Sequence, residues 1–328
     1  MNVNMKVVKI GADIGNSDTK TQHEIVASGF QEYFSLPFGA TDYIKYNGKY
    51  YVIDESRMPY QEDKTTNNYF LIMLLFGIAK EIIFQFRRKN EGKLPSQDDI
   101  NQYGYVKLGI GLPPKHFYLK EKTLEYCETV FKEGIQFEYK NLTFNISLKS
   151  VHLFPQGVSI ILAKKQLNLD LSIPNDYSDY VAVDIGSFTI ITSPFEAGKP
   201  NPAKNDVFEM GVFCMCDSII SHVKDKSGIT LKRMQVISVL QNKKSVLSDE
   251  IVEYIDTLAK EWTERILNEL RQRGLEFRST PVIFMGGGGQ LLKTYINNSS
   301  MIGVHEFIND VHMNAKAYSK LLEIYDKE

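Results

Sequence analysis

The fold is decided by Gly11-Ala12-Asp13-Ile14-Gly15-Asn16-Ser17-Asp18-Thr19-Lys20, a stretch that follows an apolar run from Val7 to Ile10. The chain repeats the pattern as Ala182-Val183-Asp184-Ile185-Gly186-Ser187-Phe188-Thr189, after Tyr180 and Val181. Both stretches read as a strand, an Asp-Ile-Gly turn and a second strand. Glycine lets the backbone turn tightly and bring its N–H groups close to an anion, and an aspartate at a strand end can hold a hydrated cation. Two such hairpins facing each other would clamp a polyphosphate and its magnesium.

A single Asp-x-Gly turn has a simpler explanation, because turns between strands use these residues for conformational reasons alone. Here the two aspartates are separated by about the length of one domain. The matched pair therefore predicts two related lobes with a nucleotide between them.

Composition limits the possible functions. The chain has 328 residues, enough for two domains, and 43% hydrophobic with 24% charged residues is typical of a soluble globular protein. The net charge of −2 argues against a surface that coats nucleic acid, so any association with DNA is expected through a partner.

Neither a metal scaffold nor a membrane segment is expected. Cys127, Cys214 and Cys216 lack a second Cys or His pair at zinc-ligand spacing, which predicts reduced, mostly buried thiols. The N-terminus has no signal-peptide pattern, and the longest apolar run, from Tyr69 to Ala79, is too short to span a bilayer. We therefore expect a cytoplasmic protein.

Several elements follow from local pattern. Asn47-Gly48 between alternating residues predicts a hairpin over 44–53, and the alternation in 135–139 and 142–148 predicts another. A further strand is expected over 151–154, and helices over 68–88, 119–132, 158–167, 211–224, 249–271 and from Asn314 onward.

Four consecutive glycines, Gly286-Gly287-Gly288-Gly289, follow the short buried strand expected over 281–285. A flexible linker is one interpretation. The strand before the glycines and the apolar helical pattern after them favour another, in which the backbone approaches a ligand closely.

These three pieces, taken in order, resemble the first phosphate loop, second phosphate loop and adenosine loop of the actin, sugar kinase and heat-shock chaperone ATPase superfamily. Within it the chain resembles the bacterial plasmid-segregation actin-like proteins of the ParM and StbA type. Supporting details are Lys64 before a helix, Gly111-Leu112-Pro113 after a strand, Phe154-Pro155-Gln156-Gly157, and Asn314-Ala315-Lys316-Ala317-Tyr318.

The resemblance implies an α/β fold of two lobes, of the duplicated ribonuclease H-like type, with a nucleotide cleft between them. We expect residues 1–155 to form lobe I and residues 156–313 to form lobe II, with residues 314–328 as a helix that packs back on lobe I.

The resemblance also implies a site for ATP or GTP with Mg²⁺. Asp13 and Asp184 are expected to organise the magnesium through water, together with the attacking water, and Lys20 to reach the phosphates. The nucleotide would be held by the loops, with Glu209 as a ribose neighbour, and its ligands are expected at Asp13, Gly15, Asn16, Ser17, Lys20, Asp184, Gly186, Ser187, Thr189, Glu209, Gly286, Gly287, Gly288 and Gly289. Phosphoryl transfer needs mainly positioning and neutralisation of oxygen charge, which such groups supply without a covalent nucleophile.

Gln156 stands where a partition actin can carry Glu. A glutamine can orient water by hydrogen bonds but cannot be a strong base, so the expected catalytic residues are Asp184, Gln156 and Asp13. The alternative is that Gln156 only caps the helix that follows it.

The function implied is a nucleotide-hydrolysing filament protein that segregates plasmid DNA through a DNA-binding adaptor on a centromere-like site, with no direct contact to nucleic acid. Two alternatives remain. A small-molecule kinase of the same fold should present a catalytic Asp in a substrate lobe, and a chaperone-like switch needs a peptide-binding domain; neither feature is evident in the sequence.

Overall fold

The computed structural model describes residues 5–54 and 61–325 and divides the chain into two compact units. Unit 1 comprises Met1–Leu169 and His312–Glu328, and unit 2 comprises Asp170–Val311. The units thus divide at 169/170 and 311/312, whereas the boundaries expected from the sequence are 155/156 and 313/314. Both units combine helices with sheets that contain parallel and antiparallel strands, as expected of an α/β fold.

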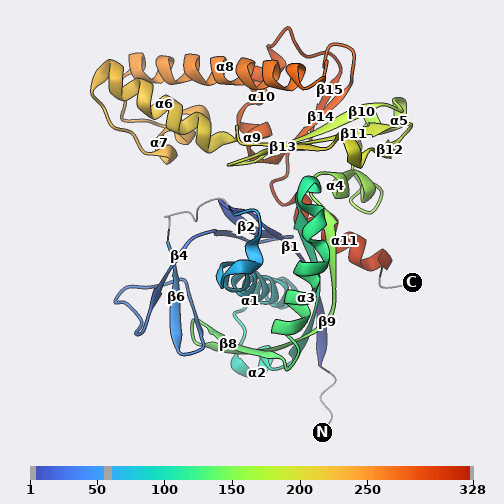
Figure 1. The fold of residues 1–328 in the computed structure, drawn as a ribbon. Helices are drawn as coiled ribbons and strands as arrows, with labels where there is room; N and C mark the ends of the chain where they lie inside the picture. Colours follow the sequence, from blue (N-terminus) through green and yellow to red (C-terminus); the bar gives the residue numbers. More distant parts are fainter. Residues whose placement is uncertain (1–4, 55–60, 326–328) are drawn as a thin grey trace. The chain divides into compact units, whose positions relative to one another are not determined.

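Unit 1 is built on one large mixed sheet (Figure 1). Among the described residues it has nine strands in the order β3-β2-β1-β7-β9-β8-β5-β6-β4. The strands are β1 (Lys6–Ile14), β2 (Asp18–Thr21), β3 (Ile25–Ala27), β4 (Phe30–Tyr33), β5 (Tyr43–Tyr46), β6 (Lys49–Ile53), β7 (Tyr103–Leu112), β8 (Ile135–Tyr139) and β9 (Leu142–Pro155). The helices are η1 (Lys64–Thr66), α1 (Tyr69–Lys89), α2 (Gln97–Ile100), η2 (Pro114–Leu119), α3 (Lys120–Val130), α4 (Val158–Leu162) and α11 (Met313–Tyr325).

Helix α1 forms the core of unit 1. It contacts β1, β2, β3, β5 and β8, so strands from distant positions in the sheet surround it (Figure 1). The helix matches the one expected over 68–88. By length and composition alone its 21 residues could cross a membrane, contrary to the expectation from the shorter apolar run, yet 72% of its most apolar window is buried inside the structure. Its buried residues lie on several sides of the helix.

Helix α11 packs on the opposite face of β1 and β7. Side chains alternate along a strand, and the core-facing residues of β1 are Val8, Ile10, Ala12 and Ile14, so Gly11 lies on the other face. A Cβ atom on Gly11 would lie 1.8 Å from the carbonyl oxygen of Ala315 in α11. On β7, a Cβ atom on Gly111 would lie 2.3 Å from the Tyr318 hydroxyl. Glycine at these positions lets α11 approach the sheet backbone.

Both predicted hairpins are present, and one expected break is not. Asn47 and Gly48 have φ angles of +48° and +75°, as a two-residue type I′ turn requires. The strands expected at 142–148 and 151–154 are one continuous strand, β9. Val106 of β7 is opposite Leu148 and Lys107 is opposite Ser150, so the residue between them forms a bulge. A bulge shifts the alternation by one residue, which made one strand look like two.

Unit 2 has a second, smaller sheet that is flanked by long helices (Figure 1). Among the described residues its strand order is β12-β11-β10-β14-β15, with β13 paired to β11. The strands are β10 (Tyr180–Ile185), β11 (Ile190–Glu196), β12 (Lys199–Pro200), β13 (Asp206–Phe208), β14 (Val282–Met285) and β15 (His305–Phe307). The helices are α5 (Ile173–Asp176), η3 (Pro202–Lys204), α6 (Val212–Ser227), α7 (Arg233–Leu240), α8 (Asp249–Gln272), α9 (Gly286–Leu291) and α10 (Lys293–Asn297).

One helix prediction is confirmed in unit 2, and one in unit 1 is wrong in its length. The amphipathic helix expected over 249–271 is α8, and its apolar stripe joins the core of unit 2. The helix expected over 158–167 is wrong in its length, because α4 ends at Leu162 and turns follow it to Asn168, whose φ is +52°. The three cysteines are free, and Cys127 and Cys216 are buried, as expected.

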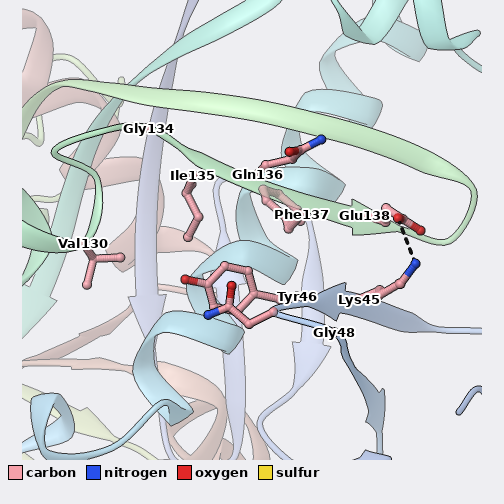
Figure 2. A pocket seen from close by; sticks show the side chains of 10 residues that line it. Lys45, Tyr46, Gly48, Val130, Gly134, Ile135, Gln136, Phe137 and Glu138 are labelled. Carbon is pink, nitrogen blue, oxygen red and sulfur yellow. Dashed lines mark hydrogen bonds and ion pairs between the residues drawn. The ribbon is translucent and has the colours of Figure 1, made fainter. Parts of the chain in front are cut away.

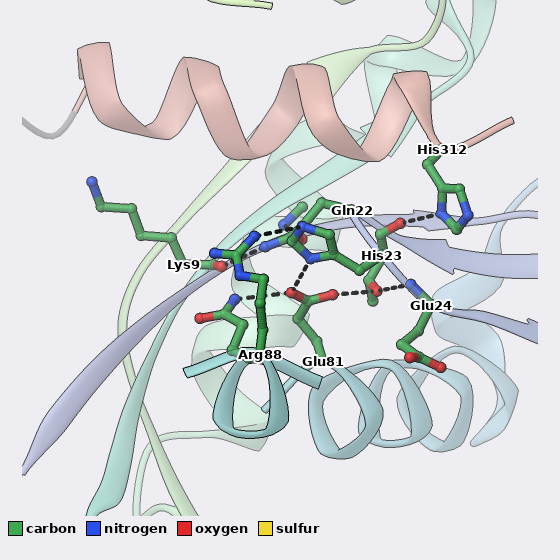
Figure 3. A network of polar contacts seen from close by, with 10 residues as sticks. Lys9, Gln22, His23, Glu24, Glu81, Arg88 and His312 are labelled. Atoms are coloured by element: carbon green, nitrogen blue, oxygen red, sulfur yellow. Dashed lines mark hydrogen bonds and ion pairs between the residues drawn. The ribbon is translucent and has the colours of Figure 1, made fainter. Parts of the chain in front are cut away.

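A buried polar network ties the end of β2 to α1 (Figure 3). The Glu81 carboxylate, fully buried, accepts hydrogen bonds from Thr21 Oγ1 at 2.7 Å and from Gln85 Nε2 at 2.9 Å, and lies 2.7 Å from His23 Nδ1. At the start of α11, His312 Nδ1 lies 2.9 Å from the Thr21 carbonyl oxygen. The strand that carries Lys20 is therefore anchored on two sides.

Candidate functional site: two phosphate-type turns

The first Asp-Ile-Gly turn joins β1 to β2. The N–H of Gly15 donates to the carbonyl oxygen of Asp18 at 3.2 Å and to that of Asp13 at 3.1 Å. A Cβ atom on Gly15 would lie 2.7 Å from the Asp18 oxygen, so glycine is needed for the close turn. Asp13 and Lys20 are paired across the two strands, and opposite residues in an antiparallel pair project from the same face. The hairpin therefore presents one carboxylate and one ammonium side by side.

The Gln156 side chain belongs to this turn. Its Nε2 donates to Asp13 Oδ1 at 2.7 Å, while its backbone N–H donates to the carbonyl oxygen of Leu112. Helix α4 takes Gly157 as its N-cap, with no side-chain cap, so the alternative of Gln156 as the capping residue does not describe the structure. The Gly157 N–H donates to Asn314 Oδ1 at 3.0 Å, which ties the Gln156 segment to α11.

Lys64 also contacts the first turn, a role that the sequence pattern does not predict. Its Nζ donates to the carbonyl oxygen of Ile14. Burial lowers the pKa of Lys64 to about 8, and the nearby Asp13 carboxylate acts in the opposite direction. Asp63 holds the segment that carries Lys64 in place, since its carboxylate caps η1 at the Thr65 N–H and pairs with Lys122 of α3. No periodicity marks such a residue, because its role comes from a contact across fifty positions of sequence.

The tip of the first turn leaves backbone donors available. In the part of the chain that the structure describes, the N–H groups of Asn16 and Ser17 form no hydrogen bond. Asn16 Oδ1 is buried and without a partner there. Ser17 Oγ donates to Asp18 Oδ2 at 2.7 Å, so this hydroxyl already has an acceptor.

The second turn, between β10 and β11, has the same hydrogen-bond pattern. The N–H of Gly186 donates to the carbonyl oxygen of Thr189 at 2.9 Å, matching the Gly15 to Asp18 bond of the first turn. The carbonyl oxygens of Gly186, Ser187 and Phe188 all accept from the start of α6, whose donors are the N–H groups of Val212, Phe213 and Gly211. These three bonds occupy the carbonyl oxygens of the turn. The N–H groups of the turn are its remaining backbone groups.

Those donors are unused. Among the described residues, the N–H groups of Ser187 and Phe188 form no hydrogen bond. Asp184, at the end of β10, has an exposed fraction of 9%. Successive free N–H groups in a turn form a concavity that binds anions, and a carboxylate beside it suits a hydrated cation. Gly186 is therefore not the donor that was expected, because its own N–H closes the turn. The N–H groups of Ser187 and Phe188 are the donors that an anion could use.

The glycine run begins a helix instead of forming a loop. Gly286 has a φ of +82°, and a Cβ atom there would lie 2.2 Å from Asp184 Oδ1. A Cβ atom on Gly288 would lie 2.4 Å from Ile185, whereas one on Gly287 would meet nothing within 4 Å. Two glycines are therefore explained by packing against β10, and Gly287 is the one with open space beside it.

Two other predicted ligands of unit 2, Glu209 and Gly289, form none of the hydrogen bonds that shape the second turn. Glu209 is exposed and precedes Gly211, the residue that donates to Phe188. Gly289 is buried in α9, with its nearest neighbour for an added Cβ atom at 3.8 Å. Within residues 5–54 and 61–325, no group of three His, Cys, Asp or Glu side chains could hold a metal ion.

A separate hollow of about 460 Å³ lies in unit 1 and includes none of the predicted site residues (Figure 2). Strands β5 and β8 pair only at Ile44–Tyr139 and Lys45–Glu138, and beyond them they diverge. Lys45 Nζ and Glu138 Oε1 are 3.2 Å apart at one end of the hollow. Its lining is otherwise Tyr46, Asn47, Gly48, Val130, Gly134, Ile135, Gln136 and Phe137.

Each turn by itself fits phosphate oxygens with a hydrated divalent cation. Each turn offers two free backbone donors and has a carboxylate at the strand end. The first turn also has two ammonium groups, that of Lys64, which is bound to the Ile14 carbonyl oxygen, and that of Lys20, which is on the paired strand. Mg²⁺ usually keeps several waters and takes one or two carboxylates plus phosphate oxygens, so it does not require a cluster of three protein ligands.

Comparisons with known proteins identify the fold. No protein-family model matches the chain, and no curated protein matches it. Solved structures match over nearly the whole length. Ta0583, an archaeal actin homologue, gives a TM-score of 0.71 at 15% identity, covering 97% of this chain and 99% of that one. The ParM of a 15-stranded filament from Clostridium botulinum gives 0.70 at 17% identity, covering 98% and 100%. Bacillus thuringiensis ParM with ATP gives 0.66 at 14% identity, covering 99% and 100%. The chain therefore has the actin-like fold and resembles ParM, as predicted.

Proposed function

We propose that this chain binds ATP or GTP with Mg²⁺ through both Asp-Ile-Gly turns, hydrolyses it, and assembles into filaments in a nucleotide-dependent way. The observation that carries the proposal is the duplicated turn: in each copy the glycine N–H closes the turn, and the next two N–H groups are free beside an aspartate. Solved structures of the same fold include a ParM with ATP and a ParM filament, which supports both parts of the proposal.

The proposed roles follow from chemistry. The N–H groups at 16–17 and 187–188 bind phosphate oxygens, and Lys20 and Lys64 offset their charge. Asp13 and Asp184 hold Mg²⁺ through water, and this ion, when bound, neutralises charge on the phosphate oxygens. Transfer of a phosphoryl group to water depends on such positioning and electrostatic stabilisation.

Gln156 is proposed to orient the attacking water. Its amide nitrogen is bound to Asp13 in the structure, and an amide has a carbonyl oxygen that can accept from water at the same time. Glu209 and the glycines Gly286–Gly289 are proposed as neighbours of the nucleoside, with Gly287 as the member that has room for a ligand.

The test is Asp184→Ala with Asp225→Ala as the matched control, since Asp225 is an exposed aspartate of the same unit. Phosphate release should fall by roughly a hundredfold or more in the first variant, in keeping with loss of a transition-state contact. The control should retain wild-type turnover. Wild-type turnover in Asp184→Ala would refute the assignment.

Assembly is tested separately by light scattering over a range of protein concentrations with ATP, GTP or no nucleotide. A critical concentration that depends on nucleotide supports a filament protein. Release of ADP that depends on an added sugar, from protein that stays monomeric, would show a small-molecule kinase instead.

We further propose a cytoplasmic protein that segregates plasmid DNA through a DNA-binding adaptor. The net charge of −2 supports an indirect contact, because proteins that bind DNA directly usually carry a basic excess. Filaments of the pure protein should therefore fail to retain DNA in co-sedimentation, and retention without any second protein would contradict the adaptor.

A further inference from the structure

The ladder between β5 and β8 ends at the hollow of about 460 Å³ in unit 1 (Figure 2). The last pair before the hollow is Lys45–Glu138. Beyond it β5 enters the Asn47-Gly48 turn, and the facing part of β8 is residues 135–137. The hollow is lined from both of these segments, and its volume is within the range of pockets that hold small ligands.

The hydrogen-bond phase of the ladder shows which main-chain groups face the hollow. In an antiparallel pair, positions that exchange N–H···O bonds alternate with positions that do not. The Lys140 N–H donates to the carbonyl oxygen of Tyr43 at 3.2 Å, which makes these two residues a hydrogen-bonded position. Four residues further along in the same register, Asn47 and Gln136 would form the same kind of pair.

That pair of hydrogen bonds is missing. Within residues 5–54 and 61–325, neither the main chain of Asn47 nor that of Gln136 has a hydrogen-bond partner on the other side of the hollow. Both residues line the hollow. Each of its two rims therefore presents one N–H donor and one carbonyl acceptor that the sheet does not use.

The rim formed by β8 has none of the features that usually block an incoming strand. Natural proteins protect an open strand edge with charged side chains, prolines or bulges. Residues 135–137 carry no charge and no proline, and they pair with β9 in an unbroken register. This short edge is therefore free to accept another strand.

The arrangement of the unused groups selects the kind of occupant. In an extended peptide, one residue directs its N–H and carbonyl groups to one side, and the next residue directs them to the opposite side. Two successive residues of such a segment match Gln136 on one rim and Asn47 on the other. A lipid chain has no such groups. At one end of the hollow Lys45 Nζ and Glu138 Oε1 lie 3.2 Å apart and neutralise each other, so a charged ligand is not favoured.

The lining also limits the side chains of the occupant. Val130, Ile135 and Phe137 line the hollow with apolar groups, and Ile135 and Phe137 are buried. Gln136, which is exposed, projects from the opposite face of β8. Because successive side chains of a strand point to opposite faces, a matching segment alternates apolar residues with uncharged polar ones.

We propose that the hollow is a docking site for an extended segment of a partner protein, which inserts as a strand between β5 and β8. Main-chain hydrogen bonds then supply the affinity, and the alternating side chains supply the specificity. The inserted strand joins the β5–β6 hairpin to the β8–β9 hairpin. The inference stands apart from the proposed nucleotide chemistry, since the hollow includes none of the predicted site residues.

The first test uses a blocked pentapeptide that alternates valine and threonine. It is added to the isotope-labelled full-length protein without nucleotide, and the backbone amide signals of Asn47 and Gln136 are followed by NMR. Both signals should shift saturably, with a dissociation constant of roughly 1 mM or lower. The absence of a saturable shift at these amides would overturn the inference.

A second peptide separates strand pairing from simple filling of the hollow. It has the same side chains, but N-methyl groups replace the amide hydrogens of alternate residues, which removes the donors along one edge. Binding should weaken by roughly tenfold, as expected for the loss of a hydrogen bond. Equal binding of the two peptides would show a cavity that takes up apolar side chains, and the inference would be wrong.

Gln136→Pro and its matched control Gln136→Ala test the rim of β8. Proline removes the N–H that faces the hollow, at an edge position where strands tolerate it, whereas alanine removes the side chain and keeps the N–H. The proline variant should bind the first peptide roughly tenfold more weakly than wild type, and the alanine variant within about twofold. A folded proline variant that binds like wild type would contradict the inference. If proline prevents folding, the N-methylated peptide decides the question on the wild-type protein.

Discussion

Replacing Lys64 with methionine tests whether a cation is held at the first turn at a cost to stability. Lys64 Nζ donates to the carbonyl oxygen of Ile14 and faces Asp13. Burial lowers its pKa from 10.5 to about 8, although Asp13 opposes the shift. An ammonium group in this position is less well solvated than in the unfolded chain. The folded protein retains it nonetheless, which is expected of a functional group more than of a structural one.

The size of the effect follows from proton linkage. Between pH 8 and 10.5 the unfolded chain binds more protons at this lysine than the folded chain, so the free energy of unfolding rises with pH across that window. For the shift from 10.5 to about 8, the rise between pH 7 and pH 10 is roughly 2 to 3 kcal/mol. This is an upper limit, because the Lys64 side chain keeps partial exposure and solvent screens part of the effect. Lys64→Met should remove that rise.

The assay is urea unfolding of wild type, Lys64→Met and Lys20→Met at several pH values from 7 to 10. Other groups titrate in this range, so the measured quantity is the difference between each variant and wild type. For Lys64→Met, the free energy of unfolding of the wild type should rise relative to that of the variant as the pH rises. For Lys20→Met, which removes an equal charge from the paired strand, the difference should change little. A constant difference for Lys64→Met across the range would refute the reasoning.

Three further predictions concern the two turns and their support. Gln156→Ala should leave nucleotide binding and assembly intact but slow phosphate release, so that filaments persist; paired time courses of phosphate release and light scattering measure this, and disassembly at the wild-type rate would contradict it. Gly286→Ala should reduce hydrolysis at least tenfold, because the added Cβ atom would lie 2.2 Å from Asp184 Oδ1; phosphate-release assays measure this, and wild-type turnover in the variant would contradict it. Glu81→Ala should lower the free energy of unfolding by about 3 kcal/mol, since it leaves buried donors without their acceptor (Figure 3), and denaturant unfolding with no measurable loss would contradict that account.

Local signals in the sequence predicted what local physics controls. The paired Asp-Ile-Gly turns, the Asn47-Gly48 hairpin and the long helices α1 and α8 all appear, because turn geometry and apolar periodicity are properties of a few consecutive residues. The broken pattern around Lys149 was misleading for a physical reason, since a bulge reverses the alternation without ending the strand.

Contacts between distant residues were not predictable in the same way. The position of Lys64 depends on η1, its Asp63 cap and the Lys122 pair, and none of these gives a periodic signal. The four glycines were interpreted as ligand contacts, yet Gly286 and Gly288 are also required by the approach of α9 to β10. A glycine in a sequence indicates that something comes close, without showing whether it is a ligand or the chain itself.

The two turns differ in what holds them, and this difference gives them different capacities for change. In unit 2 the turn is fixed by three backbone bonds from the start of α6, and a Cβ atom on Gly211 would lie 2.6 Å from Ser187. In the described part of unit 1 a single backbone bond reaches the turn from outside, from the Ser28 N–H to the Ser17 carbonyl oxygen, and side chains supply other contacts, among them Lys64 and Gln156. Backbone bonds do not respond to pH or to a change of side-chain rotamer, whereas an ammonium with a pKa of about 8 and an amide on a carboxylate do. Of the two similar turns, the first is therefore the one whose contacts can rearrange, whereas the second is held more rigidly.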